Sequence, residues 1–138
     1  VDLGKKAYYL DLSHLRFGIR SDLAFESKDV HEQTRRIAEV SNLFADSGMI
    51  TIVTSVSRFK EDRQYAKSII GEKGYVEIFI DADNEICKKR NPSIFDEDSD
   101  TMFKYERSDY PVITLYIDKA EFNSDAKVEN IINMLGYK

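Results

Sequence analysis

The chain has 138 residues, of which 42% are hydrophobic and 33% charged, and its formal net charge is −5. This length suits one compact domain, so we expect residues 1–138 to form a single domain. The net negative charge argues against a nucleic-acid partner, because phosphate backbones are bound by clustered Lys and Arg. No apolar run approaches the roughly 18–20 residues that span a bilayer, and the start carries no signal-peptide pattern. These features favour a cytoplasmic protein that binds small molecules or other proteins and has no membrane partner.

The first half of the chain alternates strand-like and helical patterns. Ala7–Asp11 and Met49–Ser55 are rich in β-branched and aromatic residues, which predicts strands. Lys28–Ser47 carries apolar residues at helical spacing and is followed by Gly48, a common helix stop. Lys60–Ile70 is predicted as a second helix, entered through a polar residue.

The second half repeats this alternation. Tyr75–Asp81 and Val112–Asp118 are predicted strands, and Asp125–Leu135 is a predicted helix closed by a glycine. Asn84–Arg90 has apolar periodicity and holds the single cysteine, which we interpret as a small buried hydrophobe because it has no disulfide partner. The acidic stretch Phe95–Asp100 is predicted as a loop.

Strands that alternate with helices of this length pair in parallel through right-handed crossovers, which predicts an α/β fold with a parallel sheet in a three-layer α/β/α sandwich. The near-continuous apolar runs predict strands that are buried on both faces. Such sheets bind ligands at the carboxyl ends of their strands. We therefore expect Asp11, Ser55 and Asp81 to point toward one crevice.

Several segments, in order, carry a more specific pattern. They are Leu23–Gly48 with its Arg35-Arg36-Ile37-Ala38-Glu39-Val40 core, Thr54–Phe59 followed by Asp62-Arg63, Glu77–Arg90 with Asp81, Ala82 and Cys87, and Tyr105–Lys119 with Pro111. In this order they resemble the adenylylsulfate kinase family, and the likeness runs from Lys6 to the C-terminus. The resemblance implies a P-loop kinase-like fold.

The resemblance also implies a reaction. Adenylylsulfate kinases transfer the γ-phosphate of ATP, with Mg²⁺, to the ribose 3′-hydroxyl of adenylylsulfate, and they begin with a strand and a Walker A loop of the GLSGSGKST type. Residues 1–138 contain no such loop, and the only glycine before the first predicted strand is Gly4. Either the phosphate-loop hairpin was lost or the chain is a fragment of a longer protein. We expect the 138-residue chain itself to be catalytically incompetent and to bind neither ATP nor Mg²⁺ on its own.

The family motif LDGDNIRxGL stands here as Leu10–Ile19. Asp11 matches a carboxylate near the attacking hydroxyl and is the expected catalytic residue, while Arg16 matches an arginine that binds the anionic groups of the substrate. The second carboxylate of the motif has become Ser13 and its Asn has become His14. An alternative for Asp11 is that it caps the following helical turn.

The resemblance assigns three further site residues. Phe25 matches an aromatic that stacks on the adenine of the substrate, with packing into the core as the alternative. Ser57, in the loop after the second strand, is assigned to substrate binding, and Arg90 is assigned to the nucleotide pocket. Val30 and Gln33 replace an Arg and an Asn of the family, which removes a bidentate anion clamp and predicts weaker binding of a phosphosulfate.

The remaining charged residues are interpreted as surface or structural groups more than as functional ones. Asn91–Asp100 replaces a basic lid and would repel phosphates, although a solvated loop without a role is the alternative. His14 and His31 have no Cys or carboxylate neighbours at metal-ligand spacing, so no metal site is predicted. Arg35 and Arg36 face different ways on a helix, and we expect them to be solvated or salt-bridged, with the alternative that one of them reaches the crevice.

Two hypotheses follow for the function. The chain is part of a kinase for adenylylsulfate or for a related nucleotide such as cytidine diphosphoramidate, or it is a non-catalytic domain that senses a nucleotide or acts as a scaffold. A glycine-rich loop with a Lys ahead of Val1 would separate the two. We expect weak nucleotide binding through Phe25 and Arg16, and either self-association or pairing with another segment of the parent protein along Ala7–Asp11 and Met49–Ser55, because a missing strand leaves unpaired backbone groups.

Overall fold

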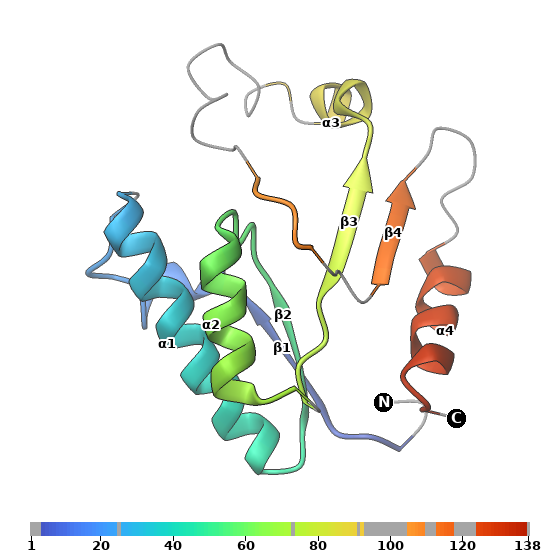
Figure 1. Cartoon of the computed structure of the whole chain (residues 1–138), viewed down its shortest axis with the longest axis horizontal. Coiled ribbons are helices and arrows are strands. Elements are labelled where there is room, and N and C mark those ends of the chain that lie inside the picture. The colour runs from blue at the N-terminus through green and yellow to red at the C-terminus, as the bar shows by residue number, and fades with distance from the viewer. Residues whose placement is uncertain are drawn as a thin grey trace. The chain divides into compact units, whose positions relative to one another are not determined.

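The computed structural model describes residues 4–24, 26–72, 74–90, 92, 105–109, 113–117 and 124–137. The chain divides into two compact units, Val1–Tyr75 and Val76–Lys138 (Figure 1). Each unit contains one pair of parallel strands. No helix within the described ranges is long and apolar enough to cross a membrane. Whether residues 1–138 form one folding domain stays a prediction.

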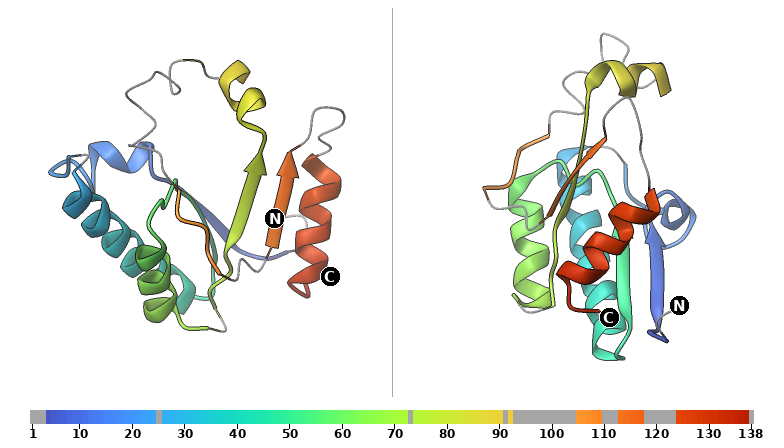
Figure 2. Two further views of the ribbon diagram at one scale, coloured as in Figure 1. Left: turned by 45° about the horizontal axis from the view of Figure 1, so that its top comes forward. Right: turned by 90° about the vertical axis from the view of Figure 1, so that its right-hand side faces the viewer.

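The first unit is built on a parallel pair of strands with two helices. Its elements are β1 (Ala7–Asp11), the 3₁₀ helix η1 (His14–Phe17), α1 (Ser27–Asp46), β2 (Ile50–Thr54) and α2 (Lys60–Ile70). The register of the pair runs from Ala7 opposite Ile50 to Asp11 opposite Thr54. Both helices lie side by side on the same side of the strand pair (Figures 1 and 2).

Glycine ends α1 for a stereochemical reason. Gly48 has φ +82, a left-handed conformation that costs L-residues energy but not glycine. In this conformation its N–H donates to the Ala45 carbonyl at 2.9 Å and the Met49 N–H donates to the Phe44 carbonyl at 3.1 Å. These two bonds satisfy carbonyls that the helix leaves without partners, and they turn the chain directly into β2.

The core of the first unit lies between the strand pair and the helices. Leu10, Leu12, Ile37 and Ala38 are buried there. At the edge of this core, the ring of Tyr8 stacks on Phe44 of α1 with centroids 4.7 Å apart.

The prediction that the strands are buried on both faces is wrong for the described structure. Tyr9 of β1 and Ile52 of β2 are 56% and 52% exposed, and Tyr8 and Val53 are exposed as well. For Tyr9 and its register partner Ile52 the physical reason is that α1 and α2 lie on one side of the pair, so the other face has no described helix of this unit against it (Figure 2). Tyr8 points to the helix side, where it stacks on Phe44 and is still 47% exposed at the edge of the core.

The second unit is smaller. It consists of β3 (Ile78–Ala82), α3 (Asn84–Arg90), β4 (Ile113–Ile117) and α4 (Ser124–Met134). The strands pair in parallel from Ile78 opposite Ile113 to Ala82 opposite Ile117. Helix α4 lies beside β4 (Figure 1) and ends at Met134, two residues before Gly136, which has φ +75.

The element order predicted from the sequence is confirmed. The strand Ala7–Asp11 and the helix Lys60–Ile70 have the predicted bounds, and most other ends differ by one residue. The largest shift is in the third strand, which was predicted from Tyr75 and begins at Ile78. The α/β class with parallel pairing is therefore confirmed, whereas the acidic segment 95–100 lies outside the described residues.

Candidate functional site

The candidate site lies at the carboxyl edge of the β1–β2 pair. Because Asp11 is the register partner of Thr54, the two strands end at the same level. The turn that follows β1 carries Arg16, and the segment that follows β2 carries Ser57. Loops at this edge of a parallel pair are where α/β proteins place their ligands.

Asp11 is held by the turn that it begins. Its Oδ1 accepts the N–H of Ser13 at 2.9 Å. This bond, followed by a side-chain bond with Ser13, lowers the pKa of Asp11, and His14 adds a smaller contribution in the same direction. The N-cap of η1 is Ser13 and has no side-chain cap bond, so Asp11 holds the turn ahead of η1 and does not cap the helix itself. The catalytic role of Asp11 stays a prediction.

Two arginines follow Asp11 in the same turn. Arg16 lies in η1 and is exposed. Arg20, which the sequence analysis did not single out, donates from Nη1 to the Leu12 carbonyl at 3.0 Å. Burial and the nearby charge of Arg16 lower the pKa of Arg20, in that order of importance. Both arginines therefore contribute positive charge to this part of the chain.

Ser57 lies in a constrained loop between β2 and α2. Its φ is +38, a left-handed conformation that is uncommon for a residue other than glycine. The Ser57 carbonyl accepts a bond from Nη1 of Arg63 at 2.5 Å, and its N–H donates to Oγ of Ser55 at 3.2 Å. Arg63 is only 5% exposed, so a buried guanidinium fixes the backbone at the candidate substrate residue.

The loop before α1 is fixed by a second arginine. Arg36 makes a bidentate pair with Asp22, at 2.6 and 2.8 Å, and donates from Nε to Glu32 at 2.8 Å. Arg35 also pairs with Glu32, at 2.7 Å. The expectation that both arginines are salt-bridged is confirmed, although both reach the same carboxylate. These bonds lower the pKa of Asp22 and of Glu32 to about 2.

For the other predicted site residues, the described structure does not decide whether they reach this edge. Phe25 lies outside the described residues, although the neighbouring Ala24 N–H is held by Oδ2 of Asp29 at 2.9 Å. Arg90 is exposed at the end of α3 and belongs to the second unit. Asp81 also belongs to that unit, so a crevice shared with Asp11 stays a prediction.

The histidines have different surroundings from those expected. The sequence gives neither histidine a Cys or carboxylate neighbour at metal-ligand spacing, but the fold places Asp62 at 2.5 Å and Glu61 at 3.4 Å from His31. This contact joins α1 to α2 and could not be found from local spacing. Among the described residues, no group of three His, Cys, Asp or Glu side chains is arranged to hold a metal ion.

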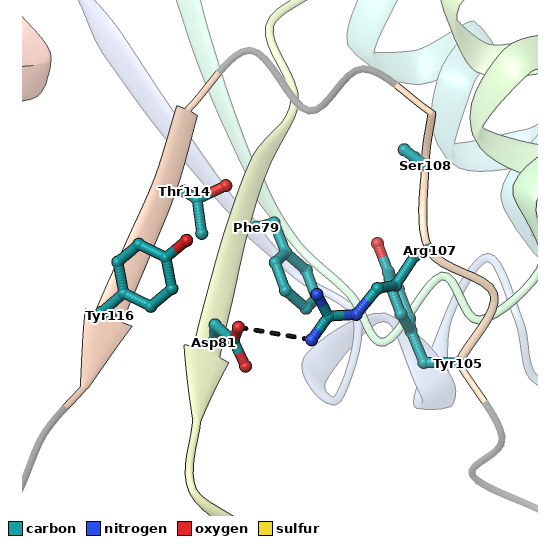
Figure 3. A pocket seen from close by; sticks show the side chains of 7 residues that line it. All are labelled: Phe79, Asp81, Tyr105, Arg107, Ser108, Thr114 and Tyr116. Atoms are coloured by element: carbon teal, nitrogen blue, oxygen red, sulfur yellow. Dashed lines mark hydrogen bonds and ion pairs between the residues drawn. The ribbon is translucent and has the colours of Figure 1, made fainter.

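A small cavity of about 90 Å³ in the second unit was also missed (Figure 3). Phe79 and Asp81 of β3 share one face with their register partners Thr114 and Tyr116 of β4. Tyr105 stacks on Phe79 with centroids 5.1 Å apart. Figure 3 shows the guanidinium of Arg107 beside Asp81, at 3.4 Å, so the polar groups of this cavity face one another.

Comparisons with known proteins show the family of the chain. A family model described as adenylylsulphate kinase matches residues 1–100. The adenylyl-sulfate kinase of Clostridium acetobutylicum is 39% identical over 143 residues, which cover 97% of this chain and 70% of that protein. The adenylyl-sulfate kinase of Clostridium kluyveri is 43% identical over 91 residues, which cover 66% of this chain and 45% of that protein.

A solved structure has the same fold. The Mycobacterium tuberculosis APS kinase CysC, solved in complex with AMPPNP and APS, matches 98% of this chain and 83% of its own with a TM-score of 0.81 and 27% sequence identity. The matched part of the chain thus covers 45% of the length of the Clostridium kluyveri protein, 70% of the Clostridium acetobutylicum protein and 83% of the Mycobacterium tuberculosis chain.

Proposed function

The chain belongs to the adenylylsulfate kinase family, and from this premise we propose that the carboxyl edge of β1 and β2 binds a nucleotide of the adenylylsulfate type. One observation carries the proposal. The register of the strand pair brings an ionised carboxylate at Asp11, a turn with two arginines and the constrained loop at Ser57 to one edge. A nucleotide with a 5′-phosphosulfate offers matching groups, namely an anion, a hydroxyl-bearing ribose and a flat base.

Each residue has a distinct role in this proposal. Arg16, supported by Arg20, attracts the phosphosulfate, because guanidinium groups bind oxyanions well. Phe25 stacks on the base, and Ser57 contacts the substrate from the second loop. Arg90, in the second unit, is assigned to the nucleotide pocket on the family resemblance alone.

In this proposal Asp11 orients a hydroxyl of the ribose. Its Oδ1 accepts the Ser13 N–H, which fixes the carboxylate at the end of β1. The same bond lowers the pKa of Asp11 and so favours the ionised form, which accepts a hydrogen bond from a hydroxyl group. The residue therefore fits positioning and electrostatic stabilisation.

ATP and Mg²⁺ are the cofactors that the family implies, and the residues of this chain fit them only in part. Mg²⁺ is commonly held by one or two carboxylates together with substrate phosphates, and Asp11 supplies one. The ATP phosphates need a glycine-rich loop of backbone N–H groups with a Lys, and residues 1–138 contain none. No transfer step is assigned to this polypeptide, which in this proposal binds the nucleotide without phosphorylating it.

The outer edge of β2 is a place where a partner strand could pair. In the described part of the first unit, β2 pairs with β1 along one edge, and no strand pairs with its other edge. A two-stranded sheet by itself is marginally stable in water. We infer that a further strand pairs there, from a second copy of this chain or from another segment of the parent protein.

Calorimetric titration with adenylylsulfate, with ADP in parallel, tests the nucleotide site. We expect weak binding of adenylylsulfate that weakens about tenfold in Phe25→Ala, since base stacking contributes roughly 1–3 kcal/mol. Tyr65→Ala, which truncates a half-exposed ring on α2, is the matched control and should leave binding unchanged. Absence of binding by the unaltered chain would refute the site, whereas binding that is unchanged in Phe25→Ala would refute only the stacking role.

A further inference from the structure

A hydrogen bond between two helices carries this inference. Nδ1 of His31, near the start of α1, lies 2.5 Å from Oδ1 of Asp62, in the first turn of α2. A carboxylate only accepts, so the imidazole N–H is the donor. The side chain of Asp62 is 7% exposed and that of His31 is 37% exposed. The contact thus joins a half-exposed imidazole to a buried acid.

The burial of the Asp62 carboxylate is compensated mainly by this bond. Its Oδ2 is buried and has no hydrogen-bond partner in the described structure. A buried carboxylate is costly unless it is hydrogen-bonded, because it has lost its hydration. Removal of the imidazole would leave Asp62 without the one partner that the structure gives it, so the first turn of α2 would have to move to rehydrate it.

The first turn of α2 in turn fixes the loop at Ser57. Arg63, next to Asp62 and equally buried, bonds the Ser57 carbonyl and so holds the left-handed backbone at that residue. Phe59, at the N-cap of α2, lies against the imidazole with ring centroids 4.9 Å apart. A strained backbone persists only when its surroundings hold it. His31 therefore contacts Phe59 and Asp62, the residues just after Ser57 and just before Arg63 in this part of the chain.

We propose that His31 and Asp62 form a positioning link that sets the conformation of residues 55–59 and thereby the placement of Ser57 for the nucleotide. The link also ties this loop to the beginning of α1, close behind the position of Phe25. The placement of Ser57 for the nucleotide rests on the proposed function. The effect of the link on the conformation of residues 55–59 is independent of it. Neither residue needs to touch the nucleotide.

Hydrogen–deuterium exchange of the full chain, read in peptides that span residues 54–64, tests the link without any ligand. His31→Leu removes the donor, whereas His31→Asn keeps an N–H close to the place of Nδ1. Gln64→Ala, at an exposed position of α2, is the control. Since a hydrogen bond to a charged group is a strong one, we expect His31→Leu to speed exchange in these peptides about tenfold or more, and His31→Asn to restore much of the protection.

The possible outcomes distinguish a specific effect of His31 on the loop from a general effect on the packing of the first unit. Faster exchange confined to residues 55–64 in His31→Leu, with β1 and β2 unchanged and with weaker adenylylsulfate binding that His31→Asn restores, supports the link. Unchanged exchange in these peptides, or a uniform rise across the first unit, overturns it. If the unaltered chain binds no adenylylsulfate, the proposed function fails while the exchange result still decides the link. If His31→Leu does not fold, Asp62→Ala, which removes the acceptor of the same bond, carries the same test with the same expectation for exchange in residues 55–64.

Discussion

The charged contacts around Arg36 show how single residues shape the candidate site. Arg36 joins Asp22 in the loop before α1 to Glu32 within α1, and it also bonds the Ile19 carbonyl at 2.7 Å. The loop that ends at the position of Phe25 is therefore fastened to the helix through one guanidinium. Its geometry depends on ion pairs that acid will break.

Acid should release this loop in a defined range of pH. The folded pKa is about 2 for Asp22, against an ordinary 3.8, and about 2 for Glu32, against 4.5. Because both pKa values are lowered by folding, the stabilisation is fully present above about pH 4.5 and is lost as the pH falls toward 2. Arg36→Gln should flatten the dependence of the unfolding free energy on pH across this window.

Urea unfolding at a series of pH values measures the effect. Lys28→Gln is the control, because it removes one positive charge from the same helix and breaks only an ion pair between two largely exposed groups. An acid dependence of Arg36→Gln that equals that of the unaltered chain would show that these pairs do not couple to folding.

Residue-level contacts differ in how far sequence can predict them. Asp11, Arg16 and Ser57 were assigned from family motifs that stand next to strand ends, and chain order then places these motifs at one edge; their roles stay predictions. The contact between His31 and Asp62 spans 31 positions and depends on how α1 packs on α2, which no local pattern encodes. The role of Arg20 was missed for a related reason, since its partner is a backbone carbonyl.

At the scale of elements, local patterns were sufficient for order and type. Apolar periodicity and terminal glycines located the helices, and β-branched runs located the strands. Burial of the strands could not be predicted in the same way. An apolar run shows that a strand has side chains suited to burial, but it does not show which other element covers them. Tyr9 and Ile52 are apolar and yet exposed in the described structure.

The helix stop at Gly48 gives a direct test at this scale. An added Cβ at Gly48 meets no atom within 4 Å, so substitution affects only the backbone, whose φ is +82. Gly48→Ala should destabilise the chain by about 1–2 kcal/mol, the usual cost of a left-handed L-residue. Gly48→Asn should cost less, since Asn tolerates this conformation. Equal losses for the two variants in urea unfolding would contradict the conformational explanation.

At the scale of the whole molecule, the exposed strand faces and unpaired edges have a consequence for assembly. Apolar side chains and free backbone groups along β1 and β2 favour pairing with another chain. We expect light scattering at micromolar concentration to show self-association of the 138-residue polypeptide. A monomer with cooperative unfolding would mean that the sheet is closed without a further strand and that the inferred partner is wrong.

The central claim is that these 138 residues hold the nucleotide side of an adenylylsulfate kinase site without the loop that holds the ATP phosphates. The most direct test supplies the purified polypeptide with Mg²⁺, adenylylsulfate and ATP labelled at the γ-phosphate, and follows transfer of the label to the ribose 3′-hydroxyl. The account predicts no labelled product above a blank without protein. Labelled product above that blank would contradict it.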